Sequence, residues 1–205
     1  MSGLREKQKA DRERRILKAA VAKFRADGYR AARIDDIAEN AEVSVGTIYN
    51  YFETKGDILI AIVAMEVEEV LTSGAALVVA PPKGIEEPVL ALIRTYYDHS
   101  LKYLSKAMWR HAMALSIQAP DTPNGRHYAN LDQRLAQQVG SLVSALQDRG
   151  DVAESLDSSS IGHMIFHTLN QLFIDFIKHD DMTLGDLDAQ VEKQLSPLFS
   201  LLSLR

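Results

Sequence analysis

Apolar side chains recur at steps of three and four residues along most of this chain, and that periodicity constrains its fold more than any other feature. The alternation of apolar and polar residues that marks a half-buried strand is hardly visible. Steps of three and four place side chains on one face of an α-helix. A chain of 205 residues is also long enough to bury a core. The sequence therefore predicts an all-α fold of about nine helices.

The predicted helices are short near the start of the chain and longer after it. The first, over residues 11–26, carries Ile16, Ala20 and Phe24 on one face and stops at Gly28. The other helices are expected over residues 34–41, 45–52, 54 to about 78, 85–104, 106–118, 125–149, 158–179 and 184–202. Ser44 is expected to cap the third helix, and Thr54 with Asp57 to form a capping-box-like pair at the start of the fourth.

Charge is distributed unevenly along the chain. Residues 1–34 carry eleven Lys and Arg against four Asp and Glu, a net charge of +7, whereas the rest of the chain has −12 and the whole has −5. A basic head on an acidic body indicates approach to an anionic polymer such as nucleic acid. A solvated, charge-rich first helix would give the same composition, so charge alone leaves both interpretations open.

Several classes of function are excluded by what the sequence lacks. There is no cysteine, which excludes disulfides, thiolate metal sites and cysteine nucleophiles. Glycine-rich phosphate loops, Ser/His/Asp signatures and metal-ligand clusters are also missing, so we expect no enzyme, no metal and no cofactor. The charged start is unlike a secretory signal, and the longest apolar run, near residues 74–82, is too short for a bilayer. We therefore expect a cytoplasmic protein with no membrane partner.

The segment between residues 33 and 52 has the pattern of a helix-turn-helix. Two short helices are joined by a turn of three or four residues, with small Ala38 where they must approach and Val43 and Ile48 filling the angle between them. In this motif the second helix enters the major groove of DNA. Its expected outer face is nearly uncharged and consists of Val45, Gly46, Thr47, Tyr49, Asn50 and Tyr51.

These residues resemble the DNA-binding pattern of the TetR family of regulators over about residues 9–62. The matching motifs, in order, are Gly28-Tyr29, Ile34-x-x-Ile37-Ala38, Val43-Ser44-x-Gly46-Thr47-Ile48-Tyr49-x-Tyr51-Phe52 and Thr54-Lys55-x-x-Ile58-Leu59. The resemblance implies DNA contacts by Ser44, Gly46, Tyr49, Asn50 and Tyr51. It also implies that the ammonium of Lys55 joins a positive helix end at a phosphate.

Three positions depart from the family pattern. Arg33 stands where a threonine usually caps the second helix; it cannot cap with an oxygen, but it can reach a phosphate. Glu42 stands where the turn commonly has glycine, and a positive φ there costs on the order of 1 kcal/mol. Val45 replaces a position that is often polar, where it can read a thymine methyl, while Thr47 can meet base edges. With these the expected DNA-binding set is Arg33, Ser44, Val45, Gly46, Thr47, Tyr49, Asn50, Tyr51 and Lys55.

The resemblance further implies two domains and a mode of action. Residues 1–53 are expected to form a three-helix DNA-binding domain, and residues 54–205 a larger helical bundle for effector binding and dimerisation, the helix from 54 to about 78 connecting them. A homodimer would bind a palindromic operator in double-stranded DNA, most simply as a repressor released by a small-molecule effector of unknown identity. The alternative is a helical dimer that regulates through protein contacts without binding DNA.

Candidate residues for the effector pocket and the dimer interface lie in the second half of the chain. An aromatic and histidine set suits a mostly apolar ligand, although core packing and surface exposure explain the same residues. Its His pair at i, i+4 is weak support for a metal. The pocket set is Tyr96, Tyr97, His99, Tyr103, Trp109, Met113, His163, Phe166, His167 and Asn170.

The apolar stripes of the last two predicted helices are wide enough for a dimer interface, or for a core within one chain. The interface set is Ile161, Ile165, Leu169, Leu172, Phe176, Leu187, Val191, Leu195 and Leu198.

Overall fold

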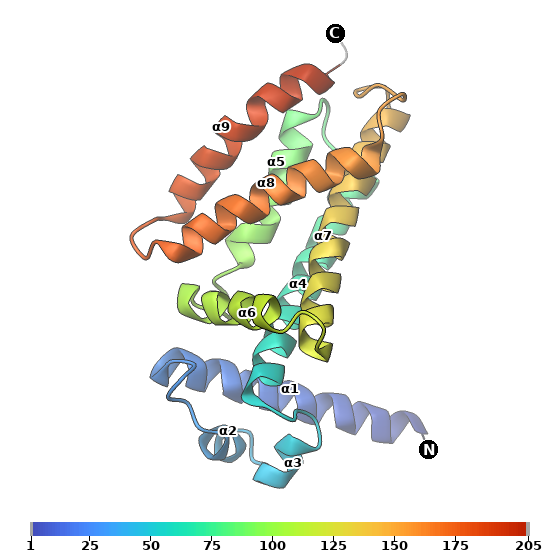
Figure 1. Ribbon diagram of the computed structural model, residues 1–205. Coiled ribbons are helices and arrows are strands. Elements are labelled where there is room, and N and C mark those ends of the chain that lie inside the picture. Colours follow the sequence, from blue (N-terminus) through green and yellow to red (C-terminus); the bar gives the residue numbers. More distant parts are fainter. Residues whose placement is uncertain (1, 204–205) are drawn as a thin grey trace. The chain divides into compact units, whose positions relative to one another are not determined.

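The computed structural model describes residues 2–203, and this part of the chain consists of nine α-helices without a strand (Figure 1). The predicted all-α fold is therefore confirmed. The helices are α1 (Ser2–Asp27), α2 (Ile34–Asn40), α3 (Val45–Tyr49), α4 (Lys55–Val79), α5 (Glu86–His99), α6 (Lys106–Gln118), α7 (Pro123–Asp148), α8 (Ser158–Lys178) and α9 (Leu184–Leu202).

The first helix begins at Ser2, well before the predicted start at Asp11. Apolar periodicity could not reveal this extension, because the residues before Ile16 have no apolar stripe. They are mainly Lys, Arg, Glu, Gln and Ala, which all have high intrinsic helix propensity. The extension therefore rests on backbone propensity and not on burial.

The chain falls into two compact units. One consists of Met1–Met65 and Lys102–Tyr128, and the other of Glu66–Leu101 and Ala129–Arg205. By this division α6 and the start of α7 belong with the helix-turn-helix, whereas the boundary expected from sequence lay between residues 53 and 54. The expected division was one of roles, DNA binding against effector binding, and it stays a prediction.

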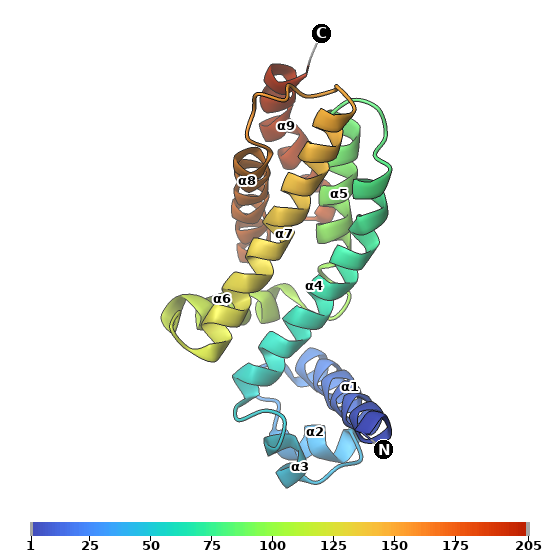
Figure 2. The same cartoon turned by 90° about the vertical axis from the view of Figure 1, so that its right-hand side faces the viewer.

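In the first unit the short helices are packed around α1. Helix α2 contacts both α1 and α3 (Figures 1 and 2). The face of α1 that contains Ile16, Ala20 and Phe24 is buried, as are Ile37 of α2 and Ile48 of α3. This burial stabilises two helices of only seven and five residues, each less than two turns long.

In the second unit α9 packs against both α8 and α5. Helices α7 and α8 approach each other closely at Gly140 and Gly162: a Cβ atom on Gly162 would lie 2.4 Å from the backbone nitrogen of Gly140. Only glycine fits at position 162, whereas a Cβ atom on Gly140 would lie 3.4 Å from its nearest neighbour, so Gly162 allows the close packing of α7 and α8. Within residues 2–203 no helix has the length and apolar content that a bilayer crossing needs.

Candidate nucleic-acid interface

Helices α2 and α3 form the helix-turn-helix that the sequence predicts. The amide of Val43 donates to the carbonyl of Ala38 at 3.0 Å, which folds the turn back on α2. Ser44 caps α3, because its hydroxyl oxygen accepts from the amide of Thr47 at 3.1 Å and lies 2.8 Å from the Thr47 hydroxyl. The predicted cap is thus confirmed, and Ser44, expected to contact DNA, also has a structural partner.

Glu42 adopts a left-handed conformation in the turn, with φ of 53°. Among the described residues it is the only one other than glycine with a positive φ. It stands where the TetR pattern commonly has glycine. Arg15 of α1 contacts this turn. Its guanidinium donates to the carbonyl of Ala41 at 3.1 Å and lies 3.8 Å from the Glu42 carboxylate. The carboxylate is thereby partly neutralised beside the surface that would face DNA.

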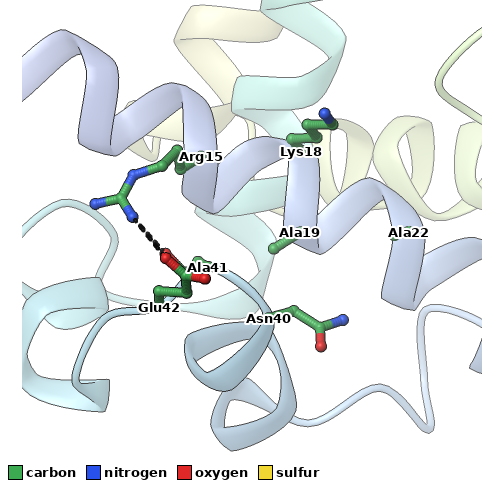
Figure 3. A pocket seen from close by; sticks show the side chains of 7 residues that line it. All are labelled: Arg15, Lys18, Ala19, Ala22, Asn40, Ala41 and Glu42. Carbon is green, nitrogen blue, oxygen red and sulfur yellow. Dashed lines mark hydrogen bonds and ion pairs between the residues drawn. The ribbon is translucent and has the colours of Figure 1, made fainter.

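A groove of about 390 Å³ lies where Arg15 crosses from α1 to the turn, and Figure 3 shows the ion pair spanning it. Small side chains from α1 and the turn form part of its lining. The lining residues are Arg15, Lys18, Ala19, Ala22, Asn40, Ala41 and Glu42.

The outward face of α3 is open. Tyr49 is 53% exposed, and Gly46 and Asn50 are exposed beside it. A Cβ atom on Gly46 would meet nothing closer than the Ser44 hydroxyl at 3.9 Å, so the space above this glycine is free. Val45 and Thr47 are half-buried. This surface can enter a DNA groove, because it presents polar and aromatic groups and no carboxylate that would repel the phosphates.

Tyr51 is turned toward α1. Its hydroxyl donates to the carbonyl of Lys9 at 3.3 Å, and the Lys9 ammonium lies 5.9 Å from the centre of its ring. The phosphate contact expected of Tyr51 stays a prediction, and in this structure its hydroxyl joins α1 to the end of α3.

Lys55 is also engaged within the protein. Its ammonium donates to the carbonyls of Arg30 and Ala32, at 2.9 and 3.1 Å, and lies 4.9 Å from the centre of the Tyr29 ring. Burial lowers the pKa of Lys55. The side chain thus fastens the loop between α1 and α2 to the start of α4, so a phosphate contact would have to be shared with these carbonyls.

Arg33 precedes α2 and makes no capping hydrogen bond with its side chain, as expected from its chemistry. The guanidinium is 74% exposed and lies 3.5 Å from the carboxylate of Asp35. It is thus placed at the surface of the first unit, where a phosphate can reach it.

A side chain from α6 meets the loop between α1 and α2, and one from α7 meets the start of α4, which the sequence did not reveal. The rings of Tyr29 and His111 lie 4.9 Å apart, and Asn124 donates to the carboxylate of Asp57. Asp57 also accepts from the amide of Thr54 at 2.7 Å, which confirms the predicted cap of α4. Burial, followed by nearby cationic side chains, lowers the pKa of His111.

The pocket candidates are divided between the two units. Tyr103, Trp109 and Met113 lie in the first unit and the others in the second. Those that are buried in the protein interior are Tyr96, Tyr97, Trp109 and Phe166, whereas Tyr103, Met113, His99, His163 and Asn170 are half-buried and His167 is exposed.

Polar partners of the second-unit candidates are found inside the protein. Tyr96 donates to the side-chain oxygen of Gln138 at 2.7 Å, and burial raises the pKa of its hydroxyl. His99 lies between two carboxylates, 2.6 Å from Glu66 and 3.0 Å from Glu69. These bonds give a structural explanation for two candidates, so their role toward an effector stays a prediction.

The paired histidines of α8 have rings 5.9 Å apart, and Nδ1 of His163 lies 2.8 Å from the carbonyl of Ser159. Among residues 2–203 no group of three or more His, Cys, Asp or Glu side chains could hold a metal ion.

Most of the interface candidates are buried within one chain, and their part in a dimer interface stays a prediction. A side chain that is already buried within one chain has almost no surface left to bury against a partner. Leu198 is half-buried, but the others form the core of the second unit, because the apolar stripes of α8 and α9 face inward. The buried ones are Ile161, Ile165, Leu169, Leu172, Phe176, Leu187, Val191 and Leu195. Apolar surface on these helices is instead offered by Met164 and Leu201, which are exposed.

The helix-turn-helix residues match a known family. Residues 16–62 match the family model described as bacterial regulatory proteins, tetR family. The chain is 25% identical over 178 residues to the fatty acid metabolism regulator protein of Bacillus subtilis (strain 168), which covers 85% of this chain and 88% of that protein. It is 39% identical over 64 residues to the HTH-type transcriptional repressor KstR of Rhodococcus jostii, or 31% of this chain and 30% of that one.

Solved structures show the same fold over nearly the whole chain. A TetR-family transcriptional regulator from Mesorhizobium loti has a TM-score of 0.76 at 18% identity, covering 95% of this chain and 98% of that one. Thermus thermophilus FadR, a TetR-family transcriptional repressor in complex with lauroyl-CoA, has a TM-score of 0.66 at 20% identity, covering 94% and 96%.

Replacing Glu42 with glycine should stabilise the protein by about 0.5–1 kcal/mol, because glycine adopts positive φ without strain and the exposed pair with Arg15 contributes little. The free energy of unfolding in urea measures this. Glu39→Gly is the matched control, since Glu39 is exposed inside α2 and glycine there should destabilise by about 1 kcal/mol. Equal destabilisation by both changes would show that the turn is not strained.

Replacing Lys55 with methionine should destabilise the protein by about 1.5 kcal/mol, because two carbonyl hydrogen bonds to a charged donor, one exposed and one part-buried, are lost. Lys18→Met, at an exposed position of α1, should change the unfolding free energy by less than about 0.5 kcal/mol. Thermal unfolding of both variants without DNA is the measurement. If Lys55→Met is as stable as the wild type, the carbonyl contacts have no structural importance.

Proposed function

Because this chain belongs to the TetR family of bacterial transcriptional regulators, we propose that it is a repressor that binds a palindromic operator as a homodimer and is released by a fatty acyl-CoA. The observation that carries the DNA-binding part is the open, carboxylate-free face of α3, which packs against α2, as α2 does against α1. A regulator of this family acts by binding, so we propose no catalytic role.

DNA recognition is proposed to use two classes of contact. Tyr49 and Asn50 point outward from α3 and can meet base edges, while Gly46 allows the backbone to approach the groove. Arg33 at the start of α2 supplies an exposed charge for a phosphate. One such helix covers only a few base pairs, so a two-fold dimer is needed for a selective operator.

The acyl-CoA proposal is supported by the proteins that resemble this chain beyond its DNA-binding segment. The B. subtilis relative aligned over 85% of the chain is named for fatty acid metabolism, and the T. thermophilus repressor with the same fold binds lauroyl-CoA. An acyl-CoA combines a long apolar chain with phosphate groups. The largely apolar interior of the helical second unit suits the first of these features.

Release requires that the effector bind the DNA-free conformation more tightly than the DNA-bound one. The coupling between the two sites is then reciprocal, so operator DNA must weaken acyl-CoA binding by the same factor. This reciprocity separates a true effector from a ligand that binds without consequence.

Operator binding is tested first. Wild-type protein should enrich a short palindromic sequence from genomic DNA fragments, and Tyr49→Ala with Asn50→Ala should lower its affinity at least about tenfold, since each base contact is worth about 1–3 kcal/mol. Ile117→Ala with Gln118→Ala removes two exposed side chains of α6 and serves as the matched control in gel shifts. If the wild type enriches no sequence even at low salt, regulation through protein contacts becomes the better proposal.

Effector release is tested on the recovered operator by fluorescence anisotropy. Lauroyl-CoA and stearoyl-CoA should raise the Kd for DNA by about 5–150-fold, the usual range of allosteric coupling. Coenzyme A alone and laurate alone are the controls, because the first lacks the apolar acyl chain and the second lacks the phosphate groups. An operator affinity that no acyl-CoA changes would refute the effector proposal and leave DNA binding intact.

A further inference from the structure

The first helix extends beyond the segment that the family model matches. It begins at Ser2, whereas the family model matches from residue 16 onward. We call residues 2–15 the N-terminal overhang. Its helical structure means that its side chains have fixed directions, so the cations it carries are arranged on particular faces.

One face of the N-terminal overhang borders the recognition helix. Residues 5, 8, 9 and 12 are spaced at i, i+3, i+4 and i+7, and therefore share a face of α1. Together with α3 they enclose a groove of about 400 Å³. The groove is lined by Arg5, Gln8, Lys9, Arg12, Thr47, Asn50 and Tyr51.

The overhang is attached to α3 by Tyr51. The hydroxyl of Tyr51 donates to the Lys9 carbonyl at 3.3 Å, and the Lys9 ammonium lies over the same ring. These contacts place the N-terminal overhang beside Thr47 and Asn50, which line the same groove. In Figure 1 the N-terminal half of α1 accordingly passes beside α3.

The groove is positively charged without compensation from its own lining, since its described lining residues include no carboxylate. Within residues 2–203 neither Arg5 nor Arg12 has an ion-pair partner. The aspartate of the overhang, Asp11, is paired with Arg14 at 2.7 Å and lies 4.0 Å from Arg15, away from this groove. Two guanidinium groups are thus available to an external anion.

We propose that the N-terminal overhang is a second DNA-contacting element, in which Arg5 and Arg12 bind phosphates of the operator strand that borders the bases read by α3. This inference rests on the proposed function and specifies it further. A guanidinium offers paired donors that match phosphate oxygens. Phosphate contacts supply affinity and register, while the nearly uncharged α3 supplies sequence selectivity.

The test is the salt dependence of binding to the operator recovered by the wild type. Each lost phosphate contact lowers the slope of log K against log salt by about 0.9, so Arg5→Gln with Arg12→Gln should lower it by about 1.8 for each bound protomer. Affinity for random DNA should fall in parallel, because phosphates carry no sequence. Circular dichroism checks that α1 stays helical, which glutamine permits.

Lys7→Gln with Arg14→Gln is the matched control. Both residues belong to the overhang, stand seven positions apart and do not line the groove, so the variant removes the same charge from another face. Its slope should equal that of the wild type. Equal losses of slope in the two double variants, or an unchanged slope for Arg5→Gln with Arg12→Gln, would overturn the proposal. A wild type that binds no operator at all would instead refute the proposed function.

Discussion

Burial of α2 against α1, and of α3 against α2, is the interaction on which the DNA-binding surface depends. The two helices contain seven and five residues, and isolated helices of that length do not persist in water. Their order comes from the contact of α2 with α1 and α3, around buried Ile16, Ile37 and Ile48. The angle at which α3 is presented to a partner is therefore a property of this small core. Substitutions in α1 should alter recognition even when they touch no DNA.

The cationic side chains of the first unit have two different roles. Arg15 and Lys55 donate to backbone carbonyls in the two loops that flank α2, so their charges hold the motif together. Arg5 and Arg12 face outward beside α3. The net charge of +7 over residues 1–34 is therefore larger than the positive charge available to DNA phosphates. His111 of α6 also contacts Tyr29 in the loop before α2, and Asn124 of α7 contacts Asp57 at the start of α4.

The sequence predicted much of this arrangement, including all nine helices and the position of the helix-turn-helix. It also predicted the caps of α3 and α4, since Ser44 and Thr54 bond to residues only three positions away. It left open whether the apolar stripes of α8 and α9 form a core or an interface, because a stripe shows that a helix face is buried but not what buries it. The start of α1 was missed because a helix without an apolar stripe has no periodicity.

Local order, fold class and the outward face of α3 were thus determined by the sequence itself, because they follow from interactions within a few residues. Tertiary structure alone decided the partners of the polar groups. Tyr51 bonds to Lys9, 42 positions away, and Lys55 to carbonyls 23 and 25 positions away. The groove beside the N-terminal overhang has the same origin. Such contacts depend on which helix faces meet, and that is settled by the packing of distant segments, which no local pattern records.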